Sequence, residues 1–412
     1  MTRALSVPVR ARRAPRPAAA PAQAVPEASR TAAADEFAPT GTRIVFSVTR
    51  SGSIRLLRGY QGHLASRGWD VHVVASPGPE LDRLMASHDG VTYHALSMAR
   101  EPSPLADLRS LVQWMRLIRR LRPDVVSAGT PKAGMLGMVA AAVLRVPVRI
   151  YHQRGLRLET ETGAKRRLLW MLERLTIRCS TRVLAVSHSL KGVLVRERLA
   201  SASKVTVLGS GSSAGVDLQR FASVPATTDR DHRVVGFVGR VTPDKGLETL
   251  AHAIRILHDR GAAPTLLVVG DVEDPAALVP VRELMGRGVR VIATGGVADP
   301  APYYQQMSVL CLPTRREGFP NVVLEAAASG IPAVTTTATG AVDSVVDGRT
   351  GFVVPVDDAR AMADALAVLL DDPARAVEFG QAALERVREQ FDRRKFWPMF
   401  DEFHSTMARR DP

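Results

Sequence analysis

Strand-like and helix-like segments alternate along this chain, and the alternation begins twice. Short runs rich in β-branched residues, such as 43–49 and Val125–Gly129, are each followed by a longer segment with helical periodicity. Strands that alternate with helices form a parallel sheet covered on both faces. After a Gly- and Ser-rich stretch at 209–215, the pattern restarts with the apolar run Val234–Val238. We therefore predict an α/β protein with two Rossmann-like, doubly wound domains.

The two predicted sheets set the domain organisation. We expect an N-terminal domain at 41–215, a linker at 216–232, a C-terminal domain at 233–390 and a final helical segment at 391–412. Residues 1–40 are rich in Ala, Pro and Arg, which predicts a disordered tail. Two open sheets side by side leave a central cleft at the carboxyl ends of their strands, where such sheets bind ligands.

Charge narrows the choice of partner. The chain has 412 residues and a formal net charge of +14, which favours anionic partners such as phosphate-bearing substrates, anionic lipid or nucleic acid. Few aromatic residues lie near the basic clusters at 116–122 and 165–167, which weakens the nucleic-acid interpretation. The two cysteines, Cys179 and Cys311, have no neighbours at metal-ligand spacing, and we expect no metal site. No apolar run is long enough to span a bilayer.

The most informative segment is 316–332, which holds Glu317 and, eight residues later, Glu325. A buried strand ends just before it, Pro320 suits the first turn of a helix at 321–329, and Gly330 suits the end of that helix. Backbone N–H groups at the start of that helix, near Gly318 and Phe319, would suit a diphosphate. The two carboxylates would then accept hydrogen bonds from sugar and ribose hydroxyls. The alternative is that Glu317 and Glu325 are simply exposed to solvent, which fits their spacing of eight residues equally well.

Two further segments follow strands and so face the predicted cleft. Gly239 ends a strand, and Arg240 and Lys245 follow it on a turn, where two cations suit a diphosphate leaving group. Gly52 and Ser53 belong to a small-residue loop that would let a ligand approach the backbone. An ordinary surface turn and an ordinary loop are the alternatives at these two places.

The segment 316–332 resembles the E-x7-E element of the retaining GT-B glycosyltransferases of family GT4, and the resemblance extends from about 43 to 391. It implies that Glu317 contacts the transferred sugar, that Glu325 binds the ribose, and that Arg240 and Lys245 stabilise the diphosphate. It also implies that the C-terminal helix crosses back onto the N-terminal domain. The nucleotide-binding set that it implies is Glu325, Gly318, Phe319, Pro320, Asn321, Val322, Gly52, Ser53 and Gly239.

Segments 130–137, 150–157 and 207–221 resemble a GT4 branch that acts on lipid-linked saccharides in bacterial polysaccharide and glycan synthesis. Some members of GT4 carry a functional histidine near the reacting sugar, at the place of His152. Here an upstream histidine common in relatives is missing, and Arg154 stands where a histidine can occur. A catalytic role and a structural role for His152 therefore both stay open.

The resemblance implies a retaining transfer of a hexose or N-acetylhexosamine from a nucleotide-diphosphate sugar, with UDP as the expected nucleotide and no cofactor required. The expected acceptor is a saccharide linked to a lipid diphosphate, met at an anionic membrane from the cytoplasmic side, with no nucleic acid involved. A soluble natural-product acceptor and a nucleotide-sugar epimerase of the same fold are the alternatives. A basic nucleic-acid-binding protein is a third, which rests on charge alone.

Overall fold

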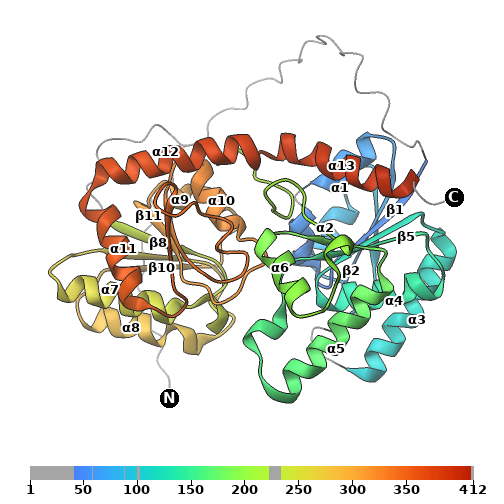
Figure 1. Ribbon diagram of the computed structural model, residues 1–412, viewed down its shortest axis with the longest axis horizontal. Coiled ribbons are helices and arrows are strands. Elements are labelled where there is room, and N and C mark those ends of the chain that lie inside the picture. Colours follow the sequence, from blue (N-terminus) through green and yellow to red (C-terminus); the bar gives the residue numbers. More distant parts are fainter. Residues whose placement is uncertain (1–40, 58, 88, 100–102, 222–232, 410–412) are drawn as a thin grey trace, which may run out of the picture. The chain divides into compact units, whose positions relative to one another are not determined.

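The computed structural model describes residues 41–57, 59–87, 89–99, 103–221 and 233–409. The expected tail at 1–40 and most of the expected linker, from 222 to 232, lie outside these residues. The described chain contains two parallel β-sheets, each flanked by helices (Figure 1). The α/β class predicted from the alternating pattern is therefore confirmed.

The first sheet has seven strands in the order β3-β2-β1-β4-β5-β6-β7. Its inner strands are buried on both faces, which explains why their sequences are apolar runs rather than alternating patterns. The strands are β1 Arg43–Ser47, β2 Asp70–Ala75, β3 Val91–Ala95, β4 Val125–Gly129, β5 Val148–Gln153, β6 Arg182–Ala185 and β7 Val205–Thr206. The helices are η1 Ser51–Leu57, α1 Tyr60–Ser66, α2 Pro79–Met85, α3 Pro104–Leu121, α4 Pro131–Val143, η2 Arg157–Thr160, α5 Gly163–Cys179, α6 His188–Arg196 and η3 Ala202–Lys204.

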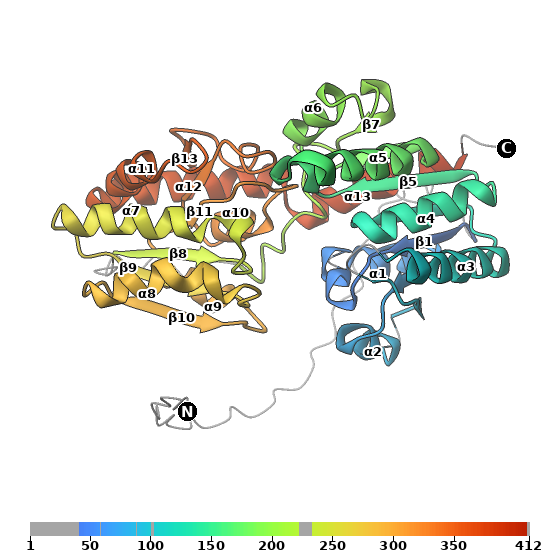
Figure 2. The same ribbon diagram turned by 90° about the horizontal axis from the view of Figure 1, so that it is seen from below.

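Three helices of this sheet lie side by side. The connections β3–α3–β4, β4–α4–β5 and β5–α5–β6 all run in one direction along the sheet, so right-handed crossovers put α3, α4 and α5 on one face. Helix α4 packs between α3 and α5, and Figure 2 shows the three in a row. The connection that holds α1 runs the opposite way and puts it on the other face.

The second sheet has six strands in the order β10-β9-β8-β11-β12-β13. The strand order reverses between β8 and β11, as it does between β1 and β4 in the first sheet, and ligands of such sheets bind at this reversal. The strands are β8 Val234–Val238, β9 Thr265–Val269, β10 Val291–Gly295, β11 Val309–Leu312, β12 Ala333–Thr336 and β13 Gly351–Val354. The helices are η4 Pro243–Lys245, α7 Leu247–Asp259, η5 Pro275–Leu278, α8 Val279–Gly286, α9 Ala301–Tyr304, α10 Asn321–Ala328, α11 Ala359–Asp371 and α12 Pro373–Gln390.

The last helix, α13 (Arg393–Arg409), belongs to the core of the first sheet. Its buried side chains Phe396, Phe400 and Phe403 join the cluster that contains Phe46 and Tyr60. A fully buried Phe side chain contributes about 1.5–3 kcal/mol, so these three rings hold the end of the chain on the N-terminal domain.

The two chain segments that connect the sheets lie against each other. The Val216 N–H donates to the Phe391 carbonyl at 2.8 Å, and the Arg393 N–H donates to the Val216 carbonyl at 3.0 Å. Gly215 has φ +70°, and a Cβ there would lie 2.6 Å from the Phe391 carbonyl oxygen. Because a side chain is excluded by both conformation and space, only glycine fits where the segments meet.

Local structure differs from the sequence prediction in a few places. The sequence pattern predicts a single helix at 56–67, but the structure divides this stretch between η1 and α1, because Gly59 adopts φ +87° and ends the helical path. Helices α2, α6 and α12 had no counterpart in the prediction. Helix α6 carried a signal, since the hydroxyl of Ser187 caps it by accepting from the Leu190 N–H.

Candidate functional site

The candidate site lies at the carboxyl ends of β8 and β11, which are neighbours in the second sheet. Gly239 directly follows β8, and Arg240 and Lys245 lie on the loop after it. Glu317 lies on the loop after β11. The strand order reverses between these two strands, so the fold brings these two loops together.

Lys245 and Glu317 form an ion pair across 72 positions of sequence. Their side chains are 15% and 13% exposed, so water screens the pair only weakly. The predicted cation and the predicted sugar-binding carboxylate are thus direct partners. A sugar held by Glu317 would therefore also lie close to the positive charge of Lys245.

Arg240 lies near the same loop but is more open. Its side chain is 49% exposed and pairs with Glu273 at 2.9 Å. Arg50, which follows the first strand, approaches Glu273 at 3.8 Å. The carboxylate of Glu273 therefore connects the loop before Gly52 to Arg240 of the other sheet.

Asp244 shows how strong the positive field is at this loop. Burial acts to raise its pKa, but the Thr242 hydroxyl and the charges of Lys245, Arg316 and Arg240 outweigh burial, so the pKa lies below its ordinary value. Its carboxylate accepts from Thr242 at 2.6 Å and from Arg316 at 3.1 Å. The positive charges that would face a diphosphate are thus partly balanced before any ligand binds.

Helix α10 starts where the sequence predicted. Pro320 occupies the position directly before the helix, without a capping hydrogen bond from its side chain, and Asn321 is the first helical residue. The Phe319 side chain is buried, with its ring 5.4 Å from that of Phe391, so only the backbone of this residue is left for a ligand. The Asn321 Oδ1 is buried and has no hydrogen-bond partner among the described residues. Val322 follows on the first turn and is partly buried.

Glu325 lies one turn further along α10 and is buried. It accepts a hydrogen bond from the Tyr304 hydroxyl of α9 at 2.8 Å. Tyr304 is itself enclosed and packs edge-on against Phe221. The carboxylate that would hold the ribose is therefore positioned by a tyrosine that the sequence analysis did not identify.

His152 ends β5 and is enclosed, with its ring 5.7 Å from that of Phe400. Burial, the Arg154 charge and His404 hold the pKa of His152 well below its ordinary value, so the ring is neutral. Arg154 approaches His152 Nδ1 at 3.0 Å and so donates to it. The neutral ring therefore carries its proton on Nε2, which is buried without a described partner. The backbone of Arg154 lies against Gly318, which follows Glu317, so Arg154 links His152 to the loop that carries Glu317. The catalytic role of His152 stays a prediction.

Gly52 and Ser53 lie in η1. Gly52 is exposed, with no atom within 4 Å of where its Cβ would be, and the Ser53 N–H donates to the Arg50 carbonyl at 2.9 Å. The loop is therefore open to a ligand on its outer side. Arg50, directly before η1, approaches Glu273, which follows β9 of the second sheet.

Glu159 of η2 is a cleft residue that the sequence analysis missed. Its Oε1 accepts from the Thr339 hydroxyl at 2.5 Å, and the Thr339 carbonyl accepts from the Glu317 N–H at 3.0 Å. Burial raises the pKa of Glu159. Its Oε2 is buried without a partner among the described residues. The only sequence signal was its position shortly after the end of a strand.

A second contact joins the two sheets at the start of α6. The Ser189 N–H donates to both oxygens of Asp343 at 3.2 and 3.3 Å, and the Ser189 hydroxyl accepts from the Gly340 N–H at 2.7 Å. A carboxylate at a helix N-terminus is favoured by the helix dipole. This contact ties the loop after β12 to the N-terminal domain.

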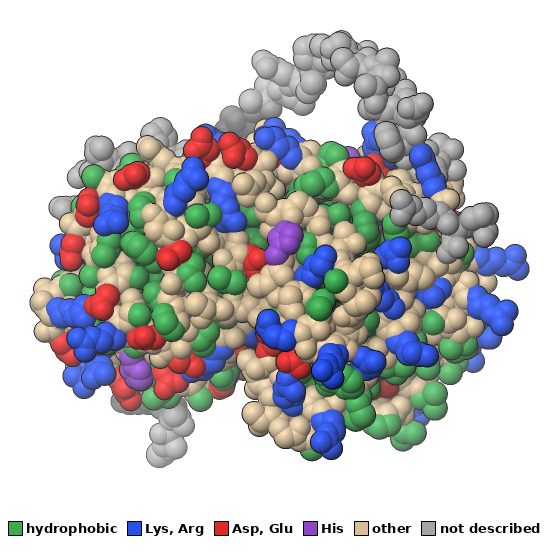
Figure 3. Space-filling model, in the orientation of Figure 1, with side chains coloured by type: hydrophobic (Ala, Val, Ile, Leu, Met, Phe, Trp, Pro, Cys, Tyr) green, Lys and Arg blue, Asp and Glu red, His purple; other side chains and the backbone are tan. Residues whose placement is uncertain are grey.

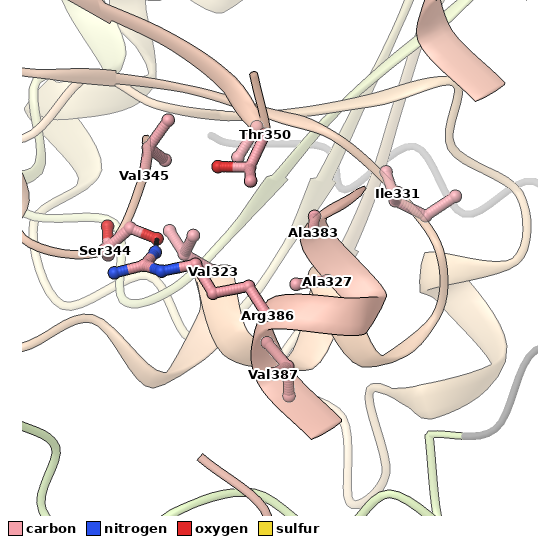
Figure 4. Close-up of a pocket in the computed structure, with 10 residues that line it drawn as sticks. Val323, Ala327, Ile331, Ser344, Val345, Thr350, Ala383, Arg386 and Val387 are labelled. Atoms are coloured by element: carbon pink, nitrogen blue, oxygen red, sulfur yellow. Dashed lines mark hydrogen bonds between the residues drawn. The ribbon is translucent and has the colours of Figure 1, made fainter. Parts of the chain in front are cut away.

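The cavity drawn in Figure 4 is lined mainly by apolar side chains, which come from α10, from α12 and from the segments around β12. Arg386 reaches across it and donates to the carbonyls of Ser344 at 2.7 Å and Asp343 at 2.8 Å. These bonds hold the loop that carries Asp343. We therefore assign this cavity to loop support rather than to substrate binding.

A half-buried carboxyl group supports the end of β5. Glu173 of α5 accepts from the Gln153 side chain at 2.6 Å. Burial raises the pKa of Glu173 to about 7 from its ordinary 4.5, against hydrogen bonds from Tyr151 and Gln153 that lower it. The folded chain therefore keeps a proton here that the unfolded chain loses above about pH 4.5. The free energy of unfolding should fall by about 3 kcal/mol as the pH rises from 4.5 to 7.

Glu173→Gln should remove this pH-dependent fall in the free energy of unfolding, because glutamine stays neutral at every pH. We expect the variant to be more stable than the wild type by up to about 3 kcal/mol at pH 8 and nearly equal to it at pH 4.5. Urea unfolding followed by circular dichroism at both pH values measures the difference. Glu389→Gln, at an exposed position of α12, is the control. Equal pH dependence of Glu173→Gln and the wild type would contradict the assignment.

The described residues contain no group of three or more His, Cys, Asp or Glu side chains that could hold a metal ion. The polar atoms grouped here are cations, carboxylates and backbone amides. The chemistry that this set supports is the binding of a diphosphate and of hydroxyl groups.

Comparison with known proteins identifies the family. Residues 51–211 match the family model of the glycosyl transferase 4-like domain, and residues 232–372 match that of the glycosyl transferases group 1. The capsular polysaccharide biosynthesis glycosyltransferase CapM of Staphylococcus aureus is 36% identical over 375 residues, which cover 89% of this chain and 98% of CapM. The chain is a glycosyltransferase of family GT4.

One further relative of this GT4 enzyme and one solved structure of similar fold are informative. The UDP-Gal:alpha-D-GlcNAc-diphosphoundecaprenol alpha-1,3-galactosyltransferase of Escherichia coli is 25% identical over 324 residues, covering 75% of this chain and 82% of the relative. The structure of Anabaena HepE in complex with UDP superposes with a TM-score of 0.72 at 19% identity, covering 89% of this chain and all of HepE. The second likeness confirms the GT-B fold.

Proposed function

We propose that this GT4 enzyme transfers a hexose or N-acetylhexosamine, with retention, from a UDP-sugar to a lipid-linked saccharide in polysaccharide synthesis. The observation that carries the proposal is the weakly screened Lys245–Glu317 pair, with Asn321 Oδ1 and Glu159 Oε2 buried nearby without described partners. Buried polar atoms are nearly always satisfied, so unsatisfied ones beside an ion pair suit a bound polar ligand. Relatives that act in capsule synthesis and on a lipid diphosphate saccharide support the choice of acceptor.

In the proposed mechanism the acceptor hydroxyl attacks on the same face of the sugar from which the diphosphate leaves. The departing phosphate oxygen takes the proton, so no separate base is required. Glu317 would orient the sugar hydroxyls, Glu325 would hold the ribose, and the backbone at Gly318 and Phe319 would meet the phosphates. Lys245 and Arg240 would stabilise the charge that develops on the leaving diphosphate.

The alternative retaining route is a double displacement, which needs a carboxylate close to the anomeric carbon. Glu159 is the N-terminal-domain carboxylate that approaches the Glu317 loop, and one of its oxygens is engaged by Thr339. Its raised pKa disfavours the ionised form that a nucleophile needs. We therefore retain the same-face route and expect Glu159 to bind a sugar hydroxyl.

The test is a transfer assay with the purified chain, in which UDP-glucose, UDP-N-acetylglucosamine and GDP-mannose are each offered with a polyprenyl-diphosphate saccharide. We expect one UDP-sugar to be consumed only when the acceptor is present, and the product to show the α-configuration of the donor by NMR. Inversion would refute the mechanism. Conversion of the donor without acceptor would indicate an epimerase, and transfer only to soluble small molecules would refute the acceptor class.

A further inference from the structure

The outer face of α3, α4 and α5 exposes an unusual number of large apolar side chains. On α3, Leu105, Leu108 and Val112 follow one another at helical spacing, on the side opposite the buried Trp114 and Ile118. Leu105 is 75% exposed and Leu108 is 59% exposed, and neither meets the core of the sheet.

Helix α5 repeats the arrangement. Leu168, Met171 and Leu175 are each between 45% and 49% exposed and form a stripe with the same spacing. Helix α4, which packs between α3 and α5, has no charged side chain on its surface, since its Lys132 is buried against Asp107. The three helices therefore present two apolar stripes separated by an uncharged helix.

Positive charge accompanies both stripes, and negative charge does not. The acidic residues of the three helices are Asp107, which pairs with Lys132, and Glu173, which accepts from Gln153; neither is exposed. Figure 3 shows Lys, Arg and apolar side chains gathered on the part of the surface where Figure 1 shows these helices. Exposed cations on the same two helices include Arg109, Arg116 and Arg119 on α3 and Arg167, Arg174 and Arg178 on α5.

We propose that this face, defined by the outward side chains of α3, α4 and α5, docks on an anionic lipid bilayer. Apolar stripes with basic flanks are the pattern of helices that lie in a membrane interface, and each cation adds attraction to anionic headgroups. A symmetric dimer through this face would bring two copies of the same basic surface together, which like-charge repulsion opposes. No aromatic side chain on the face is exposed for stacking on nucleic-acid bases.

The orientation fits the proposed function, on which this inference rests for the location of the acceptor. In a parallel sheet each crossover helix starts at the carboxyl edge, so the first turns of α3, α4 and α5 lie at the carboxyl edge of the first sheet, where Gly155 meets Gly318 of the site. Thr130, directly before α4, accepts from the Thr49 N–H at 2.9 Å at that edge. Docking through this face would hold the saccharide of a lipid-anchored acceptor beside the same edge.

The test is binding of the purified full chain to vesicles of phosphatidylcholine alone and of phosphatidylcholine with an equal amount of phosphatidylglycerol. We expect binding to the anionic vesicles that weakens as salt is raised. Leu168→Gln with Leu175→Gln should weaken it roughly 30-fold through lost apolar burial. Arg116→Gln with Arg119→Gln should weaken it by a similar factor. Val279→Gln with Met285→Gln, two exposed apolar residues of α8, is the matched control and should bind as the wild type does.

Equal binding by the wild type and both face variants would overturn the proposal, as would an equal loss in the α8 control. A dimer that the leucine variant abolishes would assign the face to a second copy instead.

Transfer to an acceptor with a short, water-soluble lipid chain separates this proposal from the proposed function. If the face variants keep that transfer but lose vesicle binding, the docking face is supported. If the wild type transfers sugar but binds no vesicles, the docking face is refuted while the proposed function stands. If the wild type binds vesicles but transfers no sugar, the proposed function is refuted while the docking face stands.

Discussion

Lys245→Ala should lower kcat about 10²-fold, which is the largest loss we expect from a single side chain of the site. The variant removes a cation that would face the developing diphosphate charge, and charge-assisted stabilisation of this kind contributes about 3 kcal/mol. It also leaves the carboxylate of Glu317, 13% exposed, without its partner. Steady-state kinetics with the preferred UDP-sugar and a saturating acceptor measure the effect.

A double-mutant cycle separates the two roles of Lys245. If Lys245 acts mainly by holding Glu317, then Lys245→Ala combined with Glu317→Gln should be no worse than the more damaging single variant. If both act on the substrate independently, the losses in transition-state stabilisation should add. Lys395→Ala, at an exposed position of α13, is the control for the loss of a lysine elsewhere. Full turnover in Lys245→Ala would remove the assigned role.

Gly318→Ala should also lower kcat about 10²-fold, for a geometric reason. A Cβ at Gly318 would lie 2.2 Å from the carbonyl oxygen of Arg154 and 3.0 Å from the backbone nitrogen of Gly155. Both neighbours are backbone, so the loops of the two domains would have to separate. A displacement of about 1 Å at a reacting centre costs about this factor in rate.

The stability of Gly318→Ala should change little, because the contact joins two loops rather than two elements of a core. We expect a urea midpoint close to that of the wild type together with the loss of turnover. Gly286→Ala, in the last position of α8 with no atom within 4 Å of the added Cβ, is the matched control and should keep full activity. A Gly318→Ala variant as active as the wild type would show that this contact is not needed for catalysis.

These two variants act on different properties of one place. Lys245→Ala changes the charge at the loop after β8, whereas Gly318→Ala changes how closely that domain approaches the loop after β5. Thr339, on the loop after β12, also joins the two domains, by a hydrogen bond of 2.5 Å to Glu159, which follows β5. The residues around Glu317 therefore determine both how closely the two domains approach each other and how the charges of the site are placed.

Much of the framework could be read from local sequence. The strand before Glu317 and helix α10 were predicted to within one residue, because Pro320 and Gly330 mark the helix ends and the apolar run marks the strand. The short helices α2 and α6 were missed because a helix of seven to nine residues shows little periodicity. Gly59 divided a predicted helix by a backbone conformation that composition alone does not reveal.

The sequence by itself determined the α/β class, the two sheets, the loops that carry Glu317, Arg240 and Lys245, and the family to which they belong. These features depend on periodicity, strand ends and turn residues that lie close together along the chain. Only the tertiary structure decided that Lys245 pairs with Glu317, that Tyr304 holds Glu325, and that Glu159 lies beside Thr339. Such pairs join segments tens to nearly two hundred residues apart, so they depend on how the strands are ordered and how the edges of the two sheets meet, which no local pattern encodes.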